Sequence, residues 1–404
     1  MLQALEKRLS KQPQIRKLYN KFMTEYQQLK HMTKVISPAP SDGMCCYLPH
    51  YCVIKSAEEK IKIRVVFNGS AKVAQNISLN QILLTGKNLL PEWLAIITNW
   101  RRHRFALVTD IEKMYRQILV ADVDKNMQRI VWRNNPAENI NDFQLNTLTY
   151  ELACAPFIAL RVLQQLAEDE KEKFPIGASV LRSETYINDI LTGASSVPEI
   201  RTLIKELVAI CMASGFLLKK WAVSSKLIED IIPKIEHQNQ PVVWQSVEGH
   251  PILGMRWNPK TDMFAFYTHL IAEKIYTKKK VLSEVPQLFD PLGWLAPVII
   301  RAKIFIQTLW LKNLDWNEPL PKKEQEFWLK FQAELPELHK IALLRWINIL
   351  ASNCSIEIHG FSDASERTIA AVVYLRVTWT SLDEYDDFHF SKISLLQSKT
   401  KVAP

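Results

Sequence analysis

Apolar residues near the start of the chain recur at the spacing of a helix. Leu2, Leu5 and Leu9 lie three or four positions apart, and the same spacing resumes at Ile15, beyond Pro13. Residues spaced in this way share one face of an α-helix, and a proline ends one helix or begins the next. The pattern therefore predicts two consecutive amphipathic helices, whose apolar faces dock on their own domain or on a partner.

Polar and apolar residues alternate in the next part of the chain, beyond a Pro- and Ser-rich segment at residues 37–43 that we interpret as a linker. Residues 47–55 and 60–67 have the composition of strands. Because the side chains of a strand alternate between its two faces, Lys62 and Arg64 share one face and can reach an anion in front of it. A solvated strand face explains the same alternation.

Two segments far apart in the sequence combine strand formers with a carboxylate. Residues 105–109 are rich in β-formers and end at Asp110, while residues 183–193 have the pattern of a hairpin around Asn188-Asp189. If the two strands pair, Asp110 and Asp189 meet at one point, a constellation suited to Mg2+ and to two-metal phosphoryl transfer. An Asp at the end of a strand is also a common turn or capping residue.

Helices and strands are mixed along the remaining chain. The pattern predicts a helix pair at 76–100, strands at 131–133 and 143–148 in the same sheet as 105–109, a helix from 150 to about 170, a helix at 198–212 and a strand at 215–221. It further predicts helices within 270–311, a connecting segment at 310–338 and strands at 355–363 and 370–376.

The composition is that of a globular protein with excess positive charge. The 404 residues include 48% hydrophobic and 23% charged residues, and the net charge is +9. This charge suits a polyanionic partner, although many basic proteins bind nothing acidic. The six cysteines form no Cys-x-x-Cys pair, the chain does not begin like a secretory signal, and Arg301 and Lys303 interrupt the most apolar run. We expect an intracellular protein, cytoplasmic or nuclear, without a transmembrane segment.

Several short motifs occur together in a recognisable order. They are Tyr-Leu-Pro-His at 47–50, Arg-Val-Val-Phe at 64–67, Thr-Asp-Ile-Glu-Lys-Met-Tyr-Arg-Gln at 109–117, Ala-Pro-Phe at 155–157, Phe-Asp-Pro-Leu-Gly at 289–293 and His-Gly-Phe-Ser-Asp-Ala-Ser-Glu at 359–366. With these motifs the chain resembles, over almost its whole length, the reverse transcriptase region of BEL/Pao-type LTR retrotransposon polyproteins.

The resemblance implies an α+β fold: a right-hand polymerase with fingers, palm and thumb, followed by a truncated ribonuclease H-like α/β unit. The implied domains are a helical leader and linker at 1–43, fingers and palm at 44–258, thumb and connection at 259–348, and the first part of the ribonuclease H-like domain at 349–404. The implied reaction is RNA-directed DNA polymerisation with two Mg2+ ions. The implied partners are an RNA or DNA template-primer and deoxynucleoside triphosphates. Binding to a membrane is not expected.

The family's metal-binding carboxylates match Asp110 and Asp189, and the carbonyl of Ile111 assists them. Asn188 departs from the family, which has two consecutive aspartates here, the first of them bridging both metals. An amide is neutral and offers one weak oxygen. At an effective dielectric of about 20, a charge pair about 4 Å apart is worth roughly 4 kcal/mol, so losing even part of it slows the reaction by orders of magnitude.

The nucleotide-binding residues implied by the resemblance are Lys62, Arg64, Tyr115 and Ile111. Arg64 matches the contact to the triphosphate, because an arginine fork reaches two oxygens at once. Tyr115 resembles the steric gate whose ring excludes a 2′-hydroxyl, although the pattern alone fits a core tyrosine equally well. Glu151 stands where the family has glycine and Asn68 where it has aspartate, so we expect weakened nucleotide and template binding.

Basic residues elsewhere match the nucleic-acid contacts of such an enzyme, namely Lys219, Lys220, Lys278, Lys279 and Lys280. Such residues contact backbone phosphates without reading bases. Surface lysines are the alternative interpretation. Asp363 resembles the first metal carboxylate of a ribonuclease H domain, which requires further acidic residues on later elements. We expect no nuclease activity from this chain.

The leading hypothesis is a retrotransposon-derived reverse transcriptase domain whose activity is impaired or lost through Asn188 and Glu151. The alternative is a non-catalytic, nucleic-acid-binding remnant of the same fold. A third hypothesis is a residual reading frame without a selected role.

Overall fold

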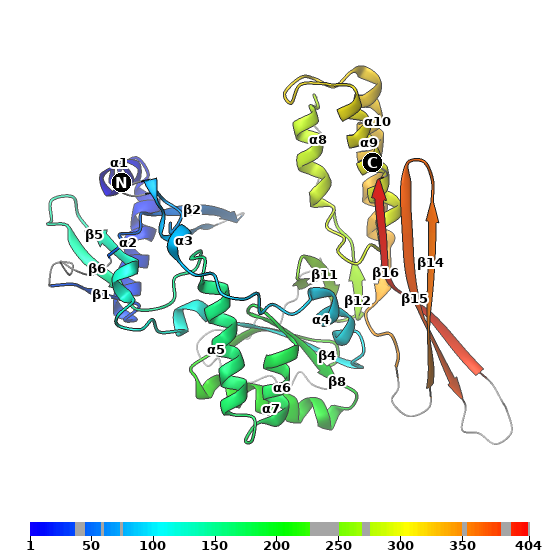
Figure 1. Ribbon diagram of the computed structural model, residues 1–404, viewed down its shortest axis with the longest axis horizontal. Coiled ribbons are helices and arrows are strands. Elements are labelled where there is room, and N and C mark those ends of the chain that lie inside the picture. The colour runs from blue at the N-terminus through cyan, green and yellow to red at the C-terminus, as the bar shows by residue number, and fades with distance from the viewer. Residues whose placement is uncertain are drawn as a thin grey trace. The chain divides into compact units, whose positions relative to one another are not determined.

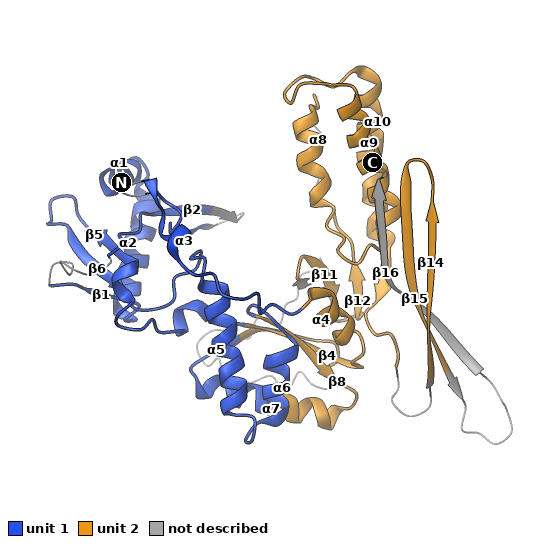
Figure 2. Cartoon of the chain, viewed as in Figure 1, with its two compact units in different colours: residues 1–91, 111–188, 206–218 blue, residues 92–110, 189–205, 219–404 orange. Residues whose placement is uncertain are grey.

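The computed structural model describes residues 1–36, 45–57, 60–72, 76–226, 250–268, 275–349, 354–380 and 389–402 (Figure 1). The predicted linker at 37–43 lies outside these residues. The chain divides into two compact units, coloured in Figure 2. Unit 1 comprises Met1–Pro91, Ile111–Asn188 and Glu206–Leu218, and unit 2 comprises Glu92–Asp110, Asp189–Lys205 and Lys219–Pro404.

Unit 1 begins with the two predicted helices, α1 (Leu2–Ser10) and α2 (Pro13–Gln28). Pro13 occupies the first position of α2, where its missing N–H costs no helical hydrogen bond. In α1, Leu5 and Leu9 are buried, and further apolar residues are buried in α2. The amphipathic faces of both helices therefore dock within the unit. The prediction of two consecutive helices is confirmed.

The described part of unit 1 contains two separate sheets. The strands predicted at 47–55 and 60–67 are present as β2 (His50–Ala57) and β3 (Lys60–Phe67), and the structure pairs them antiparallel. Strands β5 (Arg129–Trp132) and β6 (Asn141–Leu145) form a second sheet with β1 (Met32–Lys34), in the order β1-β6-β5. The prediction that the strands near residues 131 and 143 join the sheet of residues 105–109 is therefore wrong, because β6 pairs with β1 instead.

The other elements of unit 1 are short except for one helix. They are α3 (Leu79–Ile82), the 3-10 helices η2 (Met114–Gln117) and η3 (Lys125–Gln128), α5 (Ala155–Asp169), α6 (Pro175–Ser183) and β7 (Thr185–Tyr186). The helix predicted from residue 150 begins only at Ala155, where Pro156 occupies the first turn. Of the helix pair predicted at 76–100, α3 is a single turn, and the second member is α4 (Trp93–Trp100) of unit 2.

In unit 2, one sheet carries the first candidate carboxylate and includes the neighbouring strands β8-β4-β9, in this order. These strands are β4 (Phe105–Ile111), β8 (Asp189–Ala194) and β9 (Leu218–Val223), and α7 (Val197–Ala213) follows β8 in the chain. The strands β4 and β8 are antiparallel and buried over most of their length. Gly193 is required here, since a Cβ would collide with the Phe105 carbonyl oxygen of the paired strand.

A second sheet of unit 2 is an antiparallel meander in the order β10-β11-β12-β13. Its strands are β10 (His250–Ile252), β11 (Met255–Asn258), β12 (Met263–Ala265) and β13 (Ala342–Leu344). Leu253 and Gly254 both have positive φ angles, of 45° and 87°, which is typical of a tight two-residue hairpin turn. Leu253 and Gly254 thus form the turn that joins β10 to β11.

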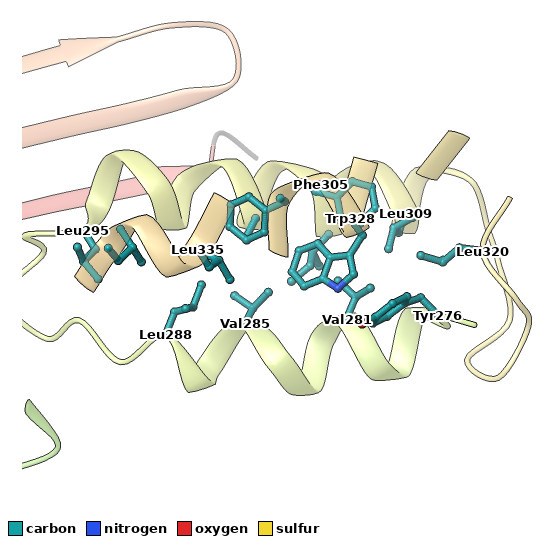
Figure 3. Packing of buried hydrophobic residues seen from close by; sticks show 14 residues of the cluster. Tyr276, Val281, Val285, Leu288, Leu295, Phe305, Leu309, Leu320, Trp328 and Leu335 are labelled. Carbon is teal, nitrogen blue, oxygen red and sulfur yellow. The ribbon is translucent and has the colours of Figure 1, made fainter. Parts of the chain in front are cut away.

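A group of helices and 3-10 turns of unit 2 shares one core, shown in Figure 3. They are α8 (Lys278–Glu284), η5 (Val285–Gln287), α9 (Ala296–Leu311), α10 (Lys322–Glu334) and η6 (Leu335–Lys340). The Trp328 ring of α10 is fully buried among Val281, Phe305 and Leu309. Residues 310–338, which we predicted as a connecting segment, thus contribute a helix to this core.

The last sheet of unit 2 is built from long antiparallel strands in the order β14-β15-β16. They are β14 (Cys354–Ala364), β15 (Thr368–Thr380) and β16 (His389–Val402). The strands predicted at 355–363 and 370–376 are confirmed. Leu375 and Val377 of β15 are buried together with Ile347, which precedes the sheet in the chain.

Candidate functional site

Two carboxylates of unit 2 face each other across neighbouring strands. Asp110 is the direct cross-strand partner of Asp189 in the antiparallel pairing of β4 with β8. Asp110 and Asp189 are partly exposed, while their strand neighbours Thr109 and Ile190 are buried. Asp110 lies inside β4, not beyond its end as the sequence pattern predicted. Although Asp110 and Asp189 lie 79 positions apart in sequence, β-pairing brings the two residues together.

Close approach of two carboxylates changes how they bind protons. The pKa of the Asp189 carboxyl is raised to about 6, first by burial and then by the negative charge of Asp110, while Lys220 acts in the opposite direction. At neutral pH the pair thus carries concentrated negative charge in a partly desolvated place. Such a place favours the binding of a cation.

A lysine side chain supplies a cation to this pair. The ammonium group of Lys220 donates a hydrogen bond to Oδ2 of Asp110 at 3.0 Å. The Lys220 side chain is 56% exposed, whereas that of Asp110 is only 15% exposed. We predicted Lys219 and Lys220 as contacts to nucleic-acid phosphates, and no local pattern in the sequence indicates that Lys220 lies at the carboxylate pair.

The oxygen ligands of this pair suit magnesium. Mg2+ in proteins is commonly held by one or two carboxylates, and water and substrate phosphates complete its coordination. Asp110 and Asp189 provide such a pair. Across the described residues, no group of three or more His, Cys, Asp and Glu side chains is placed to hold a metal ion. The assignment of Asp110 and Asp189 as metal ligands stays a prediction.

Ile111 and Asn188, which the sequence also predicted to serve the metal site, belong to unit 1. The backbone N–H of Ile111 donates to the carbonyl oxygen of Asn188 at 2.8 Å. Asn188 is half-buried and lies, with Ile187, between β7 and β8 in the chain. Ile187 has a φ of 57°, which a β-branched residue rarely adopts. The bond fixes the backbone at both predicted positions, and their roles toward a metal stay predictions.

The predicted triphosphate contacts Lys62 and Arg64 are exposed on β3. The Arg64 guanidinium lies over the ring of Tyr150, 5.1 Å from its centre, a cation–π arrangement that orients the fork. Burial is the main cause that raises the pKa of Tyr150 to about 12, so its phenol stays neutral. The sequence did not single out Tyr150, although it directly precedes Glu151.

Tyr115, the predicted steric gate, lies in the 3-10 turn η2 and not on a longer helix. Lys113, which begins this turn, has a φ of 50° and so changes the direction of the chain after β4. The Tyr115 side chain is half-buried, and burial raises its pKa. These facts fit a ring held in place, and its role toward a sugar stays a prediction.

Glu151 has a left-handed backbone, with a φ of 72°. Its carbonyl oxygen accepts a hydrogen bond from Nδ2 of Asn80 at 3.0 Å, and Oδ1 of Asn80 accepts one from the Ala153 N–H at 2.9 Å. The Asn80 side chain thus holds the turn in a conformation that glycine adopts at no steric cost. The glycine of the resembled family suits this backbone, and Glu151 is strained in it.

The three consecutive lysines at the start of α8 differ in their surroundings. Lys278 is buried, donates to the Leu314 carbonyl oxygen at 2.9 Å and lies 5.1 Å from the centre of the Trp316 ring. Lys280 lies 3.6 Å from the Glu284 carboxylate, and Lys279 is exposed. The prediction of Lys278 as a nucleic-acid contact is corrected, because its ammonium group is used inside the unit.

Asp363 is exposed near the end of β14, and its carboxylate accepts a hydrogen bond from the N–H of the next residue, Ala364, at 2.9 Å.

The Phe-Asp-Pro-Leu-Gly motif has a structural role, because Asp290 accepts hydrogen bonds from the N–H groups of Trp294 and Leu295, at 2.9 and 2.6 Å, just before α9. Asp290 therefore satisfies backbone donors at the start of that helix. The motif entered our prediction only through the family resemblance.

The C-terminal third of the chain is similar to a known protein family. Residues 277–404 match the family model of the Pao retrotransposon-like RNaseH-like domain. The match supports the predicted origin in a BEL/Pao-type retrotransposon polyprotein that has a ribonuclease H-like part. The matched range spans α8 to α10 as well as β14 to β16, and it begins after both Asp110 and Asp189.

No curated protein matches the chain. Among the helices that the structure describes, none combines the length and the apolar character needed to cross a bilayer.

Proposed function

We propose that this chain derives from the reverse transcriptase region of a retrotransposon Pol polyprotein and that its polymerase activity is impaired. The observation that carries the proposal is the cross-strand pairing of Asp110 with Asp189. The Pao retrotransposon-like match at residues 277–404 supports the retrotransposon origin. The order along the chain, with the carboxylate pair before the ribonuclease H-like part, is the order that the motifs predict.

In this proposal Asp110 and Asp189 hold magnesium. When bound, Mg2+ lowers the pKa of the primer 3′-hydroxyl and stabilises charge on the phosphate that is attacked. The two carboxylates are held on paired strands whose neighbouring residues are buried, so the protein positions them with little freedom. The exposed Arg64, oriented by the Tyr150 ring, is the residue that we assign to the triphosphate of a deoxynucleotide.

The impairment has two physical causes. Asn188, the residue before Asp189, is a neutral amide where a carboxylate would add negative charge against the metals. Glu151 adds bulk and negative charge at a position that suits glycine, beside the Tyr150–Arg64 contact. The first cause weakens metal binding and the second weakens the approach of phosphates.

The nucleic-acid partner follows from the family match and from the charge. A ribonuclease H-like domain suggests nucleic-acid binding, and the net charge of +9 attracts a polyanion. We therefore assign an RNA or DNA template-primer as the binding partner. Its affinity should fall steeply as the salt concentration rises.

One observation favours a second candidate, a nucleic-acid-binding remnant without turnover. Lys220 already neutralises Asp110 through the hydrogen bond at 3.0 Å, and Asn188 supplies no charge. A carboxylate pair whose negative charge is already partly balanced by Lys220 attracts a metal ion less strongly.

Primer extension on an RNA template with Mg2+ and deoxynucleotides tests the proposal, with the native chain compared to Asn188→Asp and Asp110→Ala. We expect little extension by the native chain. Asn188→Asp should raise the rate by at least about tenfold, because it restores one charge beside the metals. Asp110→Ala should abolish extension in either background.

Three results separate the candidates. Measurable and equal extension by the native chain and Asp110→Ala would place the polymerase activity elsewhere and contradict the proposal. Full activity of the native chain would contradict the impairment. If no variant extends but all bind primer-template in a salt-dependent way, the non-catalytic remnant is the better description.

A further inference from the structure

Lys220 has an unusual backbone for a residue within a strand. Its φ is 57°, in the left-handed region that residues with a Cβ rarely adopt, although β9 continues on both sides of it. Such a conformation costs free energy and persists only where the surrounding structure enforces it. Its neighbours in β9 that are buried, from Trp221 to Val223, hold the strand in place.

The residue before Lys220 is anchored to the residue before Asp110. The hydroxyl of Thr109 donates to the Lys219 carbonyl oxygen at 3.0 Å, and Thr109 is buried. Because β4 and β9 are neighbours in the sheet, this bond fixes the register at which Lys220 meets Asp110. Lys220 has its left-handed backbone at this position, and its ammonium group donates to Oδ2 of Asp110.

The ammonium group and a divalent cation need the same ligand. A metal ion held by Asp110 and Asp189 takes oxygen lone pairs of both carboxylates. Lys220 uses one oxygen of Asp110 and places a positive charge where a second cation would be repelled. With both carboxylates ionised, Lys220 neutralises one of the two charges.

We propose that Lys220 is a built-in counter-ion of the Asp110–Asp189 pair and competes with divalent cations, so that a metal binds only when the ammonium group is displaced. This inference rests on the proposed function, since it requires that the pair binds metal. Lys220 thus controls access of a cation to the carboxylate pair. This role differs from the phosphate contact that the family resemblance implied for Lys220. More than half of the Lys220 side chain is exposed, which leaves it room to swing away.

Binding of Mn2+ to the full chain, followed by the electron paramagnetic resonance signal of the free ion, tests the competition. Lys220→Met removes the charge at similar length, and Lys220→Arg keeps the charge. We expect Lys220→Met to tighten Mn2+ binding roughly threefold to tenfold, because a half-exposed ion pair is a modest competitor. Lys220→Arg should stay within about twofold of the native chain.

Thermal unfolding gives a second measurement that does not depend on activity. Without metal, Lys220→Met should unfold at a lower temperature than the native chain, because the two carboxylates then repel each other without a counter-ion. Added Mn2+ should raise the unfolding temperature of Lys220→Met by more than that of the native chain. Equal increases would overturn the competition.

Asp110→Asn distinguishes failure of the inference from failure of the proposed function. If Asp110→Asn weakens Mn2+ binding but Lys220→Met fails to tighten it, the metal site stands and the competition is refuted. If Asp110→Asn leaves Mn2+ binding unchanged, the carboxylate pair is not a metal site and both proposals fail. Weaker binding in Lys220→Met would also refute the competition.

Discussion

Glu151 illustrates how a single residue departs from what its backbone requires. With a φ of 72°, it occupies a conformation in which a Cβ is crowded and glycine is not. Glycine also makes the unfolded chain more flexible, which offsets part of the relief. We expect Glu151→Gly to raise the free energy of unfolding by about 0.5–1 kcal/mol in urea denaturation.

Glu170→Gly provides the matched control for this change. Glu170 is also a glutamate outside the regular helices, directly after the last residue of α5, but its φ is −105°, which any residue adopts. Glycine there should bring no gain in stability. If Glu151→Gly were no more stable than the native chain, the strain assigned to Glu151 would be absent.

His50 is a buried imidazole that the fold keeps neutral. Its Nδ1 lies 2.6 Å from the Tyr19 hydroxyl and its Nε2 lies 3.0 Å from the Val131 carbonyl oxygen. Burial lowers the pKa of His50 below its ordinary value of 6.5. The unfolded chain therefore binds a proton that the folded chain does not, and stability falls as the pH drops below about 6.5.

The corresponding measurement is urea denaturation at pH 7 and pH 5.5. The native chain should lose up to about 1.4 kcal/mol per pH unit through this one group. His50→Gln should lack that part of the pH dependence of stability. His359→Gln is the control, because the His359 side chain of β14 is about half-exposed, and this variant should keep the pH dependence of the native chain. Identical pH dependence in all three proteins would show that His50 does not contribute.

At the residue scale the sequence predicted that Asp110 and Asp189 meet, but not which residues surround them. Asp110 and Asp189 follow from strand composition together with a polar pair, because those signals are local. Lys220 does not, since a left-handed backbone within β9 leaves no mark in the residue type. The burial of Lys278 was missed for a similar reason, because the Leu314 carbonyl that it contacts lies 36 positions away.

At the scale of elements, a buried ion pair connects β12 and β13 to the segment that leads into β4. Arg345 is fully buried, donates to both oxygens of Asp262 at 2.6 and 2.8 Å, and also donates to the carbonyls of Trp100 and His103 at 2.8 Å each. Trp257 donates to the same carboxylate at 2.9 Å. This cluster supports the position of β4, and hence of Asp110.

We expect Asp262→Ala to lower the free energy of unfolding by about 3 kcal/mol or more, because it leaves the Arg345 charge buried without its partner. Glu334→Ala is the control, since it removes a partner of Arg301 from an ion pair in which both side chains are about half-exposed. Its cost should stay below about 1 kcal/mol. Similar costs for both variants, measured in urea, would contradict the role assigned to Arg345.

Elements that depend on local periodicity were predicted well, and their partners were not. The helices α1, α2 and α9 and the strands β4, β14 and β15 follow from spacing and composition along one segment. The sheet to which β6 belongs depends on β1, which lies far earlier in the chain, and no local signal identifies that partner. The position of α10 was missed for the same reason. Trp328 of α10 packs into the core that it shares with α8 and α9, and no local signal identifies these partners.

At the scale of the whole molecule, two independent observations fall in unit 2. The carboxylate pair on β4 and β8 belongs to it, and so do residues 277–404, which match the Pao retrotransposon-like RNaseH-like domain. The match supports the origin of the chain, and the carboxylate pair carries the proposed chemistry. The proposal therefore depends most on whether Asp110 and Asp189 hold one cation.

Cleavage of the backbone by bound iron tests this point most directly. Fe2+ replaces Mg2+ at oxygen sites, and with ascorbate and peroxide it produces radicals that cut the chain close to the ion. Mass spectrometry of the fragments should reveal cuts near both residue 110 and residue 189, lost together in Asp110→Asn and suppressed by excess Mg2+. Cuts near only one of the two residues, or cuts that persist in Asp110→Asn, would contradict a shared metal site.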